Sequence, residues 1–204
     1  MRRATLPTSV ESFLEELRAI ALLGLNYTKD PYDRERYERL LELAAVEYGS
    51  LARLSADEVL NRFRAELGHI TPKVGVDAAI YDDDGRLLLI RRTDDDCWCL
   101  PCGWAEVGES PQEAIAREVF EETGLRIRVE SLVDLFTRFP GTYGPHTGYF
   151  LVFHCVVVGG TLTESPEASD AGYFLPDEVT GWHRDHQVRA ERARRYWLET
   201  LSSR

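Results

Sequence analysis

The sequence lacks a long hydrophobic run. No apolar segment of its 204 residues approaches the ~18 residues that a membrane-spanning helix requires. Residues 1–7 carry charge with no apolar stretch behind them, so we expect no secretory signal, no membrane partner and a cytoplasmic location. Internal repeats and low-complexity segments are also missing. Hydrophobic residues make up 44% and charged residues 29% of the chain, which is typical of a globular protein with a buried core.

Basic residues are scarce relative to acidic ones. The chain has 24 lysines and arginines against 35 aspartates and glutamates, for a formal net charge of -11. This balance disfavours an extended nucleic-acid surface, because nucleic acids are themselves negatively charged. A small polyphosphate ligand would be repelled as well. Phosphate chemistry would therefore require a metal ion or a local basic pocket.

Cysteines are few. Cys97, Cys99 and Cys102 lie within one short segment, and Cys155 stands alone. A zinc site would need a fourth ligand at a suitable spacing, and the neighbouring sequence offers none. The sequence therefore favours free thiols in a strand and a turn over a zinc site or a structural disulfide.

Residues 1–70 predict a small domain of three amphipathic helices. Apolar side chains recur at helical spacing over residues 10–23, and we expect Gly24 to end that helix. Asp30 and Ser55 have the chemistry of N-caps for the second and third helices. Three short helices make a thin core. We therefore expect this domain to pack on the rest of the chain or on a partner subunit.

Residues 71–204 mix strand and helix patterns. Strands are expected at 73–81, 86–91, 98–100, 125–133, 147–158 and 173–175, and helices at 111–123 and 183–201. Strands on both sides of a central helix predict an α+β or mixed α/β fold.

The expected helix at 111–123 is the best specified of these elements. Ser110 is its N-cap, Glu113 completes a capping box, and Gly124 supplies the left-handed geometry that ends many helices. Both ends of this helix are therefore fixed by local chemistry.

Three glutamates share one face of that helix. Glu118, Glu121 and Glu122 stand at positions i, i+3 and i+4, where like charges cost a few tenths of a kcal/mol per pair. A solvent-exposed charged face is one interpretation. The other is a hard oxygen site for Mg²⁺ or Mn²⁺. Arg117 is placed to reach Glu121 or to orient a neighbouring glutamate.

The surrounding residues favour the metal site. The whole string resembles the Nudix box, whose pattern is glycine, five residues, glutamate, seven residues, Arg-Glu-apolar, one residue, Glu-Glu, one residue, Gly-apolar. Every fixed position is filled here, by Gly103, Glu109, Arg117, Glu118, Val119, Glu121, Glu122, Gly124 and Leu125.

This resemblance implies a fold, a reaction and a ligand set. The fold would be an α/β/α sandwich with a mixed sheet, and the reaction Mg²⁺-dependent hydrolysis of a nucleoside diphosphate linked to another group X, with Mn²⁺ as an alternative metal. The metal ligands would be Glu118, Glu121, Glu122 and the Gly103 carbonyl. Glu118, Glu121 and Arg117 would be catalytic, and Glu109 and Gly124 would support the loop and helix.

Residues outside the box are candidates for substrate binding and proton transfer. The general base would be Glu118 or a loop glutamate, Glu164 or Glu167, of which Glu167 fits the family's acidic loop better. Arg91 could bind phosphate, although ordinary surface charge explains it equally. Trp98 and Tyr143 could stack on a nucleobase, and the alternative for each is core packing.

One position departs from the family pattern. Relatives commonly have Leu-Pro-Gly-Gly before the box, whereas this chain has Leu100, Pro101, Cys102 and Gly103. If the position of Cys102 requires a positive φ, the cysteine brings strain into the metal loop. A Nudix-fold isomerase uses a cysteine in catalysis, so that reaction stays open as a runner-up.

Residues 20–37 resemble the helical N-terminal domain of a Nudix subgroup. That subgroup includes bacterial CDP-choline pyrophosphatases and proteins called ADP-ribose pyrophosphatases, and its N-terminal domain contributes to homodimers and can border the active site. CDP-choline, cleaved to CMP and phosphocholine, is therefore our leading substrate. The alternatives are ADP-ribose or another nucleotide sugar, an RNA 5′-end diphosphate, or a non-catalytic nucleotide sensor.

Overall fold

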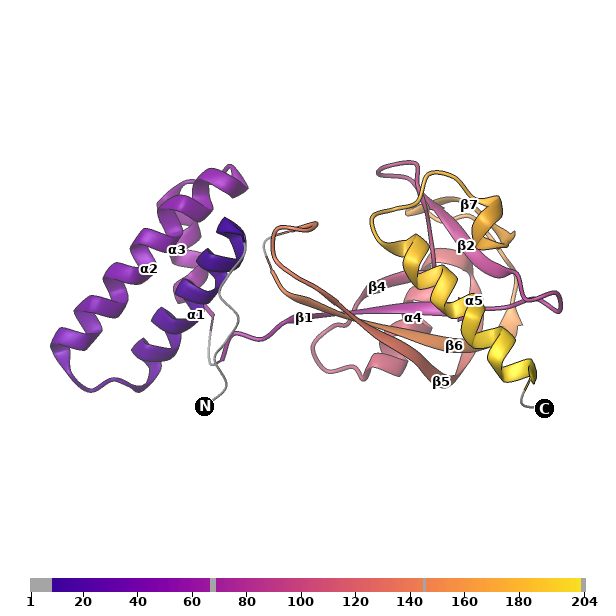
Figure 1. Ribbon diagram of the computed structural model, residues 1–204, viewed down its shortest axis with the longest axis horizontal. Helices are drawn as coiled ribbons and strands as arrows, with labels where there is room; N and C mark the ends of the chain where they lie inside the picture. The colour runs from indigo at the N-terminus through magenta and orange to yellow at the C-terminus, as the bar shows by residue number, and fades with distance from the viewer. Residues whose placement is uncertain (1–8, 67–68, 145, 203–204) are drawn as a thin grey trace. The chain divides into compact units, whose positions relative to one another are not determined.

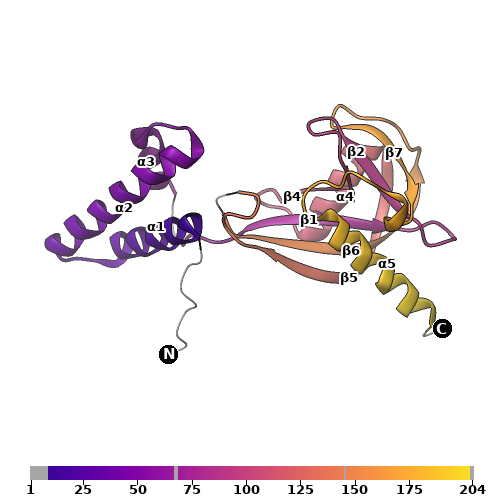
Figure 2. The same cartoon turned by 45° about the horizontal axis from the view of Figure 1, so that its top comes forward.

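The computed structural model describes residues 9–66, 69–144 and 146–202. Its residues divide into two compact units, each described here by itself. The first unit combines the chain up to Lys73 with the segment Arg138–Thr147, and the second combines Val74–Thr137 with the chain from Gly148 onward. Figures 1 and 2 show the elements of each unit.

The described residues of the first unit form three helices, as the sequence predicts. They are α1 (Val10–Tyr27), α2 (Pro31–Ala52) and α3 (Ala56–Arg64). The side chains of Asp30 and Ser55 accept hydrogen bonds from the first-turn amides of α2 and α3, as N-caps do. The core of this unit is formed by Leu14, Ala21, Leu22, Leu41, Ala44, Ala45, Tyr48, Val59 and Phe63.

The predicted role of Gly24 as a helix end is wrong. Helix α1 continues through Gly24 to Tyr27, and Thr28 caps it. The glycine serves close packing instead, because a Cβ at this position would lie 2.5 Å from the ring of Tyr37 on α2. The glycine at this position is therefore explained by the contact between α1 and α2 and not by the end of a helix.

The second unit contains two sheets. One has the strand order β4-β1-β6-β5 and the other the order β3-β2-β7. The strands are β1 (Lys73–Ile80), β2 (Leu87–Arg92), β3 (Trp98–Cys99), β4 (Cys102–Trp104), β5 (Leu125–Arg138), β6 (Gly148–Gly160) and β7 (Ala168–Phe174). β1 pairs antiparallel with β4, and β2 pairs antiparallel with both β3 and β7.

Helices cover the four-stranded sheet on both faces. Val76, Ala78 and Ile80 of β1 pack in one core cluster with residues of α4 (Pro111–Thr123). Ala79, which points the other way along the same strand, packs in a second cluster with Ala190 and Ala193 of α5 (His186–Ser202). The layers can be followed in Figure 1. The α/β/α sandwich implied by the sequence is confirmed.

Several boundaries differ from the sequence expectation. β5 extends to Arg138, β7 begins already at Ala168, and α5 begins at His186. The pattern also gave no sign of β4 or of the short 3₁₀ turn Pro176–Glu178. These elements depend on pairing and packing with distant residues, and this is why local patterns miss them.

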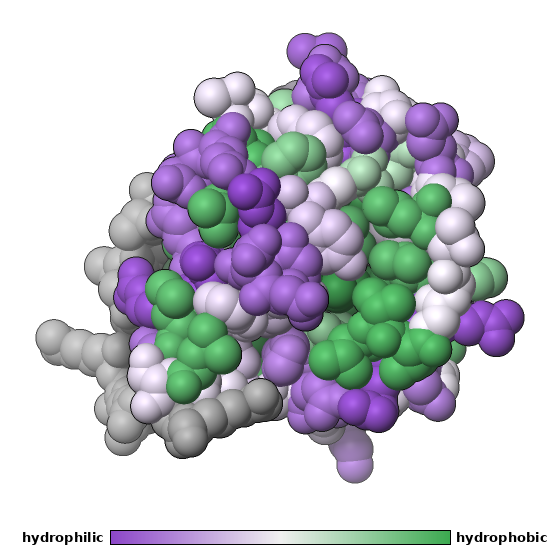
Figure 3. Space-filling model, turned by 90° about the vertical axis from the view of Figure 1, so that its right-hand side faces the viewer, coloured by the Kyte–Doolittle hydropathy of each residue, from purple (hydrophilic) through white to green (hydrophobic). Residues whose placement is uncertain are grey.

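Surface hydropathy is unevenly distributed. Figure 3 shows one face on which hydrophobic side chains gather beside a hydrophilic area. Exposed large apolar side chains of the second unit include Val157, Val158, Leu198 and Leu201. Among the described residues, no helix is both long enough and apolar enough to span a bilayer.

Candidate functional site

Helix α4 is held at both ends as its sequence predicts. The Ser110 hydroxyl accepts a hydrogen bond from the Glu113 amide, and the Glu113 carboxylate accepts one from the Ser110 amide at 2.8 Å. At the other end Gly124 adopts φ 72°, a left-handed value that favours glycine. These caps fix the rotation of the helix and with it the directions of its glutamates.

Glu122 is buried, with only 2% of its surface exposed. Its carboxylate accepts a hydrogen bond from the Cys102 amide at 2.9 Å, which connects α4 to the first residue of β4. Burial raises the pKa of Glu122 well above its usual range, and the nearby Cys99 adds to the effect. A carboxylate at this depth requires positive charge to ionise, so the solvent-exposed interpretation does not hold for Glu122.

Glu118 lies against the backbone of Gly103. A Cβ at Gly103 would overlap the Glu118 carboxylate, so the glycine is required for this close approach. Partial burial raises the pKa of Glu118, the Arg117 guanidinium opposes that shift, and the charges of Glu121 and Glu167 add to it. Glu118, Gly103 and Glu122 therefore belong to one site.

Arg117 connects the acidic residues of the box. Its guanidinium donates to Glu109 at 2.9 Å, to Glu118 at 2.9 Å and to Glu121 at 3.0 Å. It also donates to the carbonyl of Trp104, the last residue of β4, at 3.1 Å. Hydrogen bonding to Glu109 is the main reason that the pKa of Arg117 is raised. Arg117 holds the helix and the loop together and orients two predicted ligands.

Glu121 and Glu167 are the more exposed acidic residues of the cluster. Glu121 has 57% of its side chain exposed. Glu167 precedes β7, where its amide is bonded to the Ser165 hydroxyl, and its charge acts on Glu118. The role of Glu167 as a general base stays a prediction.

Cys102 brings no left-handed strain into the metal loop. It lies in β4, pairs with Asp77 of β1, and is absent from the non-glycine residues that have positive φ. The conformation that would have favoured glycine is therefore not required at this position. Its amide is free to donate to Glu122 whatever the side chain.

The predicted substrate-binding residues have other contacts. Arg91 forms an ion pair with Asp96 at 2.7 Å. The ring of Trp98 packs edge-on against Phe174, as in the core-packing alternative. Tyr143 belongs to the first unit, where the Arg138 guanidinium lies 5.2 Å from its ring centre. Their roles in substrate binding stay predictions.

The sequence did not predict a group of buried polar side chains next to Cys102, which pairs with Asp77. Asp77 and Arg189 form a buried ion pair at 2.8 Å, and His186 lies beside them. Arg92, which follows the phosphate-binding candidate Arg91 and shares its pattern, lies close enough to Glu122 for its charge to lower the pKa of that carboxyl. The sequence offered one signal, the Cys-x-x-Cys spacing of Cys99 and Cys102.

The carboxylate cluster fits a divalent cation. Glu118 and Glu122 offer hard oxygen atoms beside a glycine backbone, which is the donor type that Mg²⁺ and Mn²⁺ prefer. A bound cation would also supply the charge that the buried Glu122 needs in order to ionise. The assignment of Glu118, Glu121, Glu122 and the Gly103 carbonyl as metal ligands stays a prediction.

We predict that Arg117→Lys lowers kcat/KM of the hydrolysis reaction about 10–100-fold, because residues that orient metal ligands typically contribute this much. Lysine keeps the charge but cannot reach the four acceptors that Arg117 contacts. Steady-state kinetics over a range of Mg²⁺ concentrations measures the effect. Arg128→Lys, at an arginine paired with Glu130 on β5, is the control. Wild-type rates for Arg117→Lys would contradict this role.

We also predict that the metal-free protein loses stability as pH rises. The pKa of Glu122 is higher in the folded than in the unfolded chain, so its contribution is complete below about pH 4.3 and is lost as pH rises through the folded value. Urea unfolding in a chelator, from pH 5 to pH 8, measures this trend. In Glu122→Gln the loss should be smaller, and Mg²⁺ should reverse it in the wild type. Equal pH dependence in both proteins would contradict the prediction.

Comparisons with known proteins show which families the two parts of the chain resemble. Residues 71–197 match the family described as NUDIX domain, and residues 10–62 match a "UDP-X-like, N-terminal oligomerisation domain". A Bacillus subtilis protein named "Putative ADP-ribose pyrophosphatase YjhB" is 31% identical over 81% of this chain and 80% of its own length. The ADP-ribose pyrophosphatase of Methanocaldococcus jannaschii is 34% identical over 58% of this chain and 71% of its own.

A solved structure, that of a UDP-X diphosphatase, resembles both parts of the chain. It is 31% identical, with a TM-score of 0.60, and the match covers 92% of this chain and 93% of the other. The family match covers more than half of the sequence and includes the box residues. The chain therefore belongs to the Nudix hydrolase family.

Proposed function

We propose that this protein is a pyrophosphohydrolase that requires a divalent metal, Mg²⁺ or Mn²⁺, and cleaves the diphosphate of a nucleoside diphosphate linked to X. The observation that carries the proposal is the arrangement of two carboxylates. Glu118 lies against Gly103, and Glu122 is buried under the Cys102 amide. Glu121 and the Gly103 carbonyl would complete the ligand set.

The residues of the site have different roles in the proposed reaction. When bound, the divalent ion would supply positive charge against the diphosphate and acidify a water molecule. Glu118 and Glu122 would hold that ion, and Arg117 keeps Glu118 and Glu121 in place. Glu167, whose charge acts on Glu118, takes the proton as the water oxygen attacks phosphorus and the bridging P–O bond breaks.

For the substrate we propose a pyrimidine nucleoside diphosphate linked to X. The resemblance of residues 20–37 favours CDP-choline, and the likeness to a UDP-X diphosphatase adds UDP-linked compounds. ADP-ribose is the competing candidate, because two relatives carry that substrate in their names. An RNA 5′ end is disfavoured by the net charge of -11.

A substrate panel tests both levels of the proposal. Purified protein with Mg²⁺ or Mn²⁺ is assayed on CDP-choline, UDP-glucose, ADP-ribose, NADH and triphosphorylated RNA, and nucleoside monophosphate release is measured. We expect the highest kcat/KM on CDP-choline or UDP-glucose. Preference for ADP-ribose would overturn the choice of base and leave the reaction intact. Binding without hydrolysis of any compound would favour a nucleotide sensor.

We further propose that the protein forms a homodimer through its first unit. Several large apolar side chains of the helices are exposed there, among them Phe13 at 54% and Ile20 at 50%. The N-terminal family match, described as an oligomerisation domain, agrees with this. Light scattering of the full chain should give twice the mass of 23.3 kDa, and Phe13→Asp with Ile20→Asp should give the monomer.

A further inference from the structure

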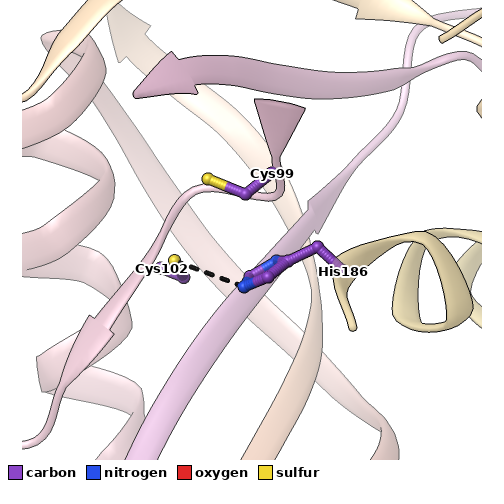
Figure 4. Close-up of side chains that lie close together, drawn as sticks. All are labelled: Cys99, Cys102 and His186. Carbon is purple, nitrogen blue, oxygen red and sulfur yellow. Dashed lines mark hydrogen bonds between the residues drawn. The ribbon is translucent and has the colours of Figure 1, made fainter. Parts of the chain in front are cut away.

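We propose that Cys99, Cys102 and His186 bind a soft divalent metal ion of the Zn²⁺ type, at a site separate from the carboxylate cluster. One ligand atom from each of the three residues lies within 4.8 Å of the other two. The Cys102 Sγ and His186 Nε2 atoms are 4.0 Å apart. Figure 4 shows both sulfur atoms and the imidazole facing a common space.

The distances are close to those of a tetrahedral zinc site. With Zn–S bonds of about 2.3 Å and Zn–N bonds of about 2.0 Å, neighbouring ligand atoms lie about 3.5–3.8 Å apart. The separations in this cluster, at most 4.8 Å, would need to shorten by about 1 Å or less. Side-chain rotation is sufficient for such a change, and the backbone can stay in place.

The chain positions of the ligands suit a metal site. Cys99 and Cys102 flank the turn between β3 and β4, and the two residues between them allow both thiols to face one side. His186 is the first residue of α5, so a metal would join that helix to the turn. The four cysteines are free thiols, as the sequence predicts. The sequence showed no further ligand near them because His186 is 84 residues away from Cys102.

A carboxylate stands behind the imidazole. The Asp77 Oδ1 atom lies 3.8 Å from His186 Nδ1, on the ring edge opposite to the one that faces the thiols. This separation is longer than a hydrogen bond. Histidine ligands of metals commonly donate their second ring N–H to a carboxylate, so a bound metal would draw these two atoms together. Arg189 holds Asp77 at 3.0 and 2.8 Å, so the carboxylate is already oriented.

The proposed zinc-type site and the carboxylate cluster differ in their donor atoms and therefore in the metal ions that they select. Thiolate and imidazole ligands select zinc-like ions, whereas the carboxylates of α4 select Mg²⁺ or Mn²⁺. Among the described residues the cluster offers three ligands, which leaves the fourth position of a tetrahedral ion to water or a small ligand. The sites are neighbours, because the Cys102 amide donates to Glu122. A bound soft ion would therefore stiffen the turn that supports the carboxylate cluster.

Cobalt spectroscopy of the full-length protein tests this site. Reduced, metal-free protein is titrated with Co²⁺ and then Zn²⁺ in millimolar Mg²⁺, which occupies the carboxylates. We expect a near-ultraviolet thiolate-to-cobalt charge-transfer band that saturates at about one ion per chain and disappears when Zn²⁺ displaces Co²⁺. Absence of the band in the wild-type protein would overturn the proposal, and this result does not depend on the folding of any variant.

Variants then assign the ligands. Cys99→Ser, Cys102→Ser and His186→Asn should each weaken Zn²⁺ binding at least tenfold in competition with a chelator. Cys97→Ser and Cys155→Ser are matched controls, because these thiols lie outside the cluster. Zn²⁺ should raise the thermal midpoint of the wild type and of both controls but not of Cys99→Ser. Wild-type affinity in the cluster variants, or equal weakening in the controls, would overturn the assignment.

Discussion

Glu118→Gln is expected to lower kcat about 10²–10³-fold, because a divalent ion contributes several kcal/mol to the transition state and each 1.36 kcal/mol is tenfold in rate. Glutamine keeps the shape that fits against Gly103 and can still accept from Arg117. It removes the negative charge that holds the cation. We therefore expect a folded protein that needs a higher Mg²⁺ concentration to reach half of its remaining activity.

The measurement combines steady-state kinetics with Mg²⁺ and substrate titrations. Glu191→Gln is the matched control, because it changes a helical glutamate on α5 that contacts Gln187 rather than the site. Substrate binding in Glu118→Gln should persist at reduced affinity, since glutamine keeps the shape of the side chain. A Glu118→Gln rate within about threefold of the wild type would exclude Glu118 from the metal site.

Gly103→Ala should reduce activity about 10²-fold, although it adds one methyl group. The new Cβ would overlap the Glu118 carboxylate and force it out of position. A displacement of about 1 Å in a reacting group typically costs this much. The overlapping atoms are the far end of the flexible Glu118 side chain and not backbone atoms, so we expect the fold and its thermal midpoint to change little.

Gly159→Ala provides the control for that substitution. Gly159 is in β6, its φ is not positive, and a Cβ there would meet nothing within 4 Å. Circular dichroism and kinetics of both variants separate a local displacement from unfolding. If Gly103→Ala keeps full activity, Glu118 does not depend on the glycine backbone for its position.

The sequence alone predicts helix α4 and its carboxylates well, and physical reasons explain why. The caps at Ser110 and Gly124 act within one turn of the helix, and the glutamate spacing is a property of the helix itself. The network around Arg117 spans residues 104–121, so its members are also close in sequence. Such features need no knowledge of the tertiary fold.

Features that depend on distant residues were not predictable in this way. Gly24 is fixed by Tyr37 of another helix, and β4 exists because Cys102, Gly103 and Trp104 pair with β1. The burial of Glu122 follows from the turn that covers it, and no spacing on α4 distinguishes it from the exposed Glu121. His186 reaches the thiols only through the placement of α5.

The segment Arg138–Thr147 has a practical consequence for dissecting this protein. It belongs to the first unit, where the Ser12 hydroxyl donates to the Pro140 carbonyl and the Tyr48 hydroxyl contacts His146, yet the sequence places it between β5 and β6. The two units are thus interleaved along the chain, and no single cut separates them. A fragment that starts at residue 71 would contain the segment Arg138–Thr147 but would lack the helices that this segment contacts. A fragment that ends at residue 70 would contain the helices without that segment, so we expect neither fragment to fold as it does in the full chain.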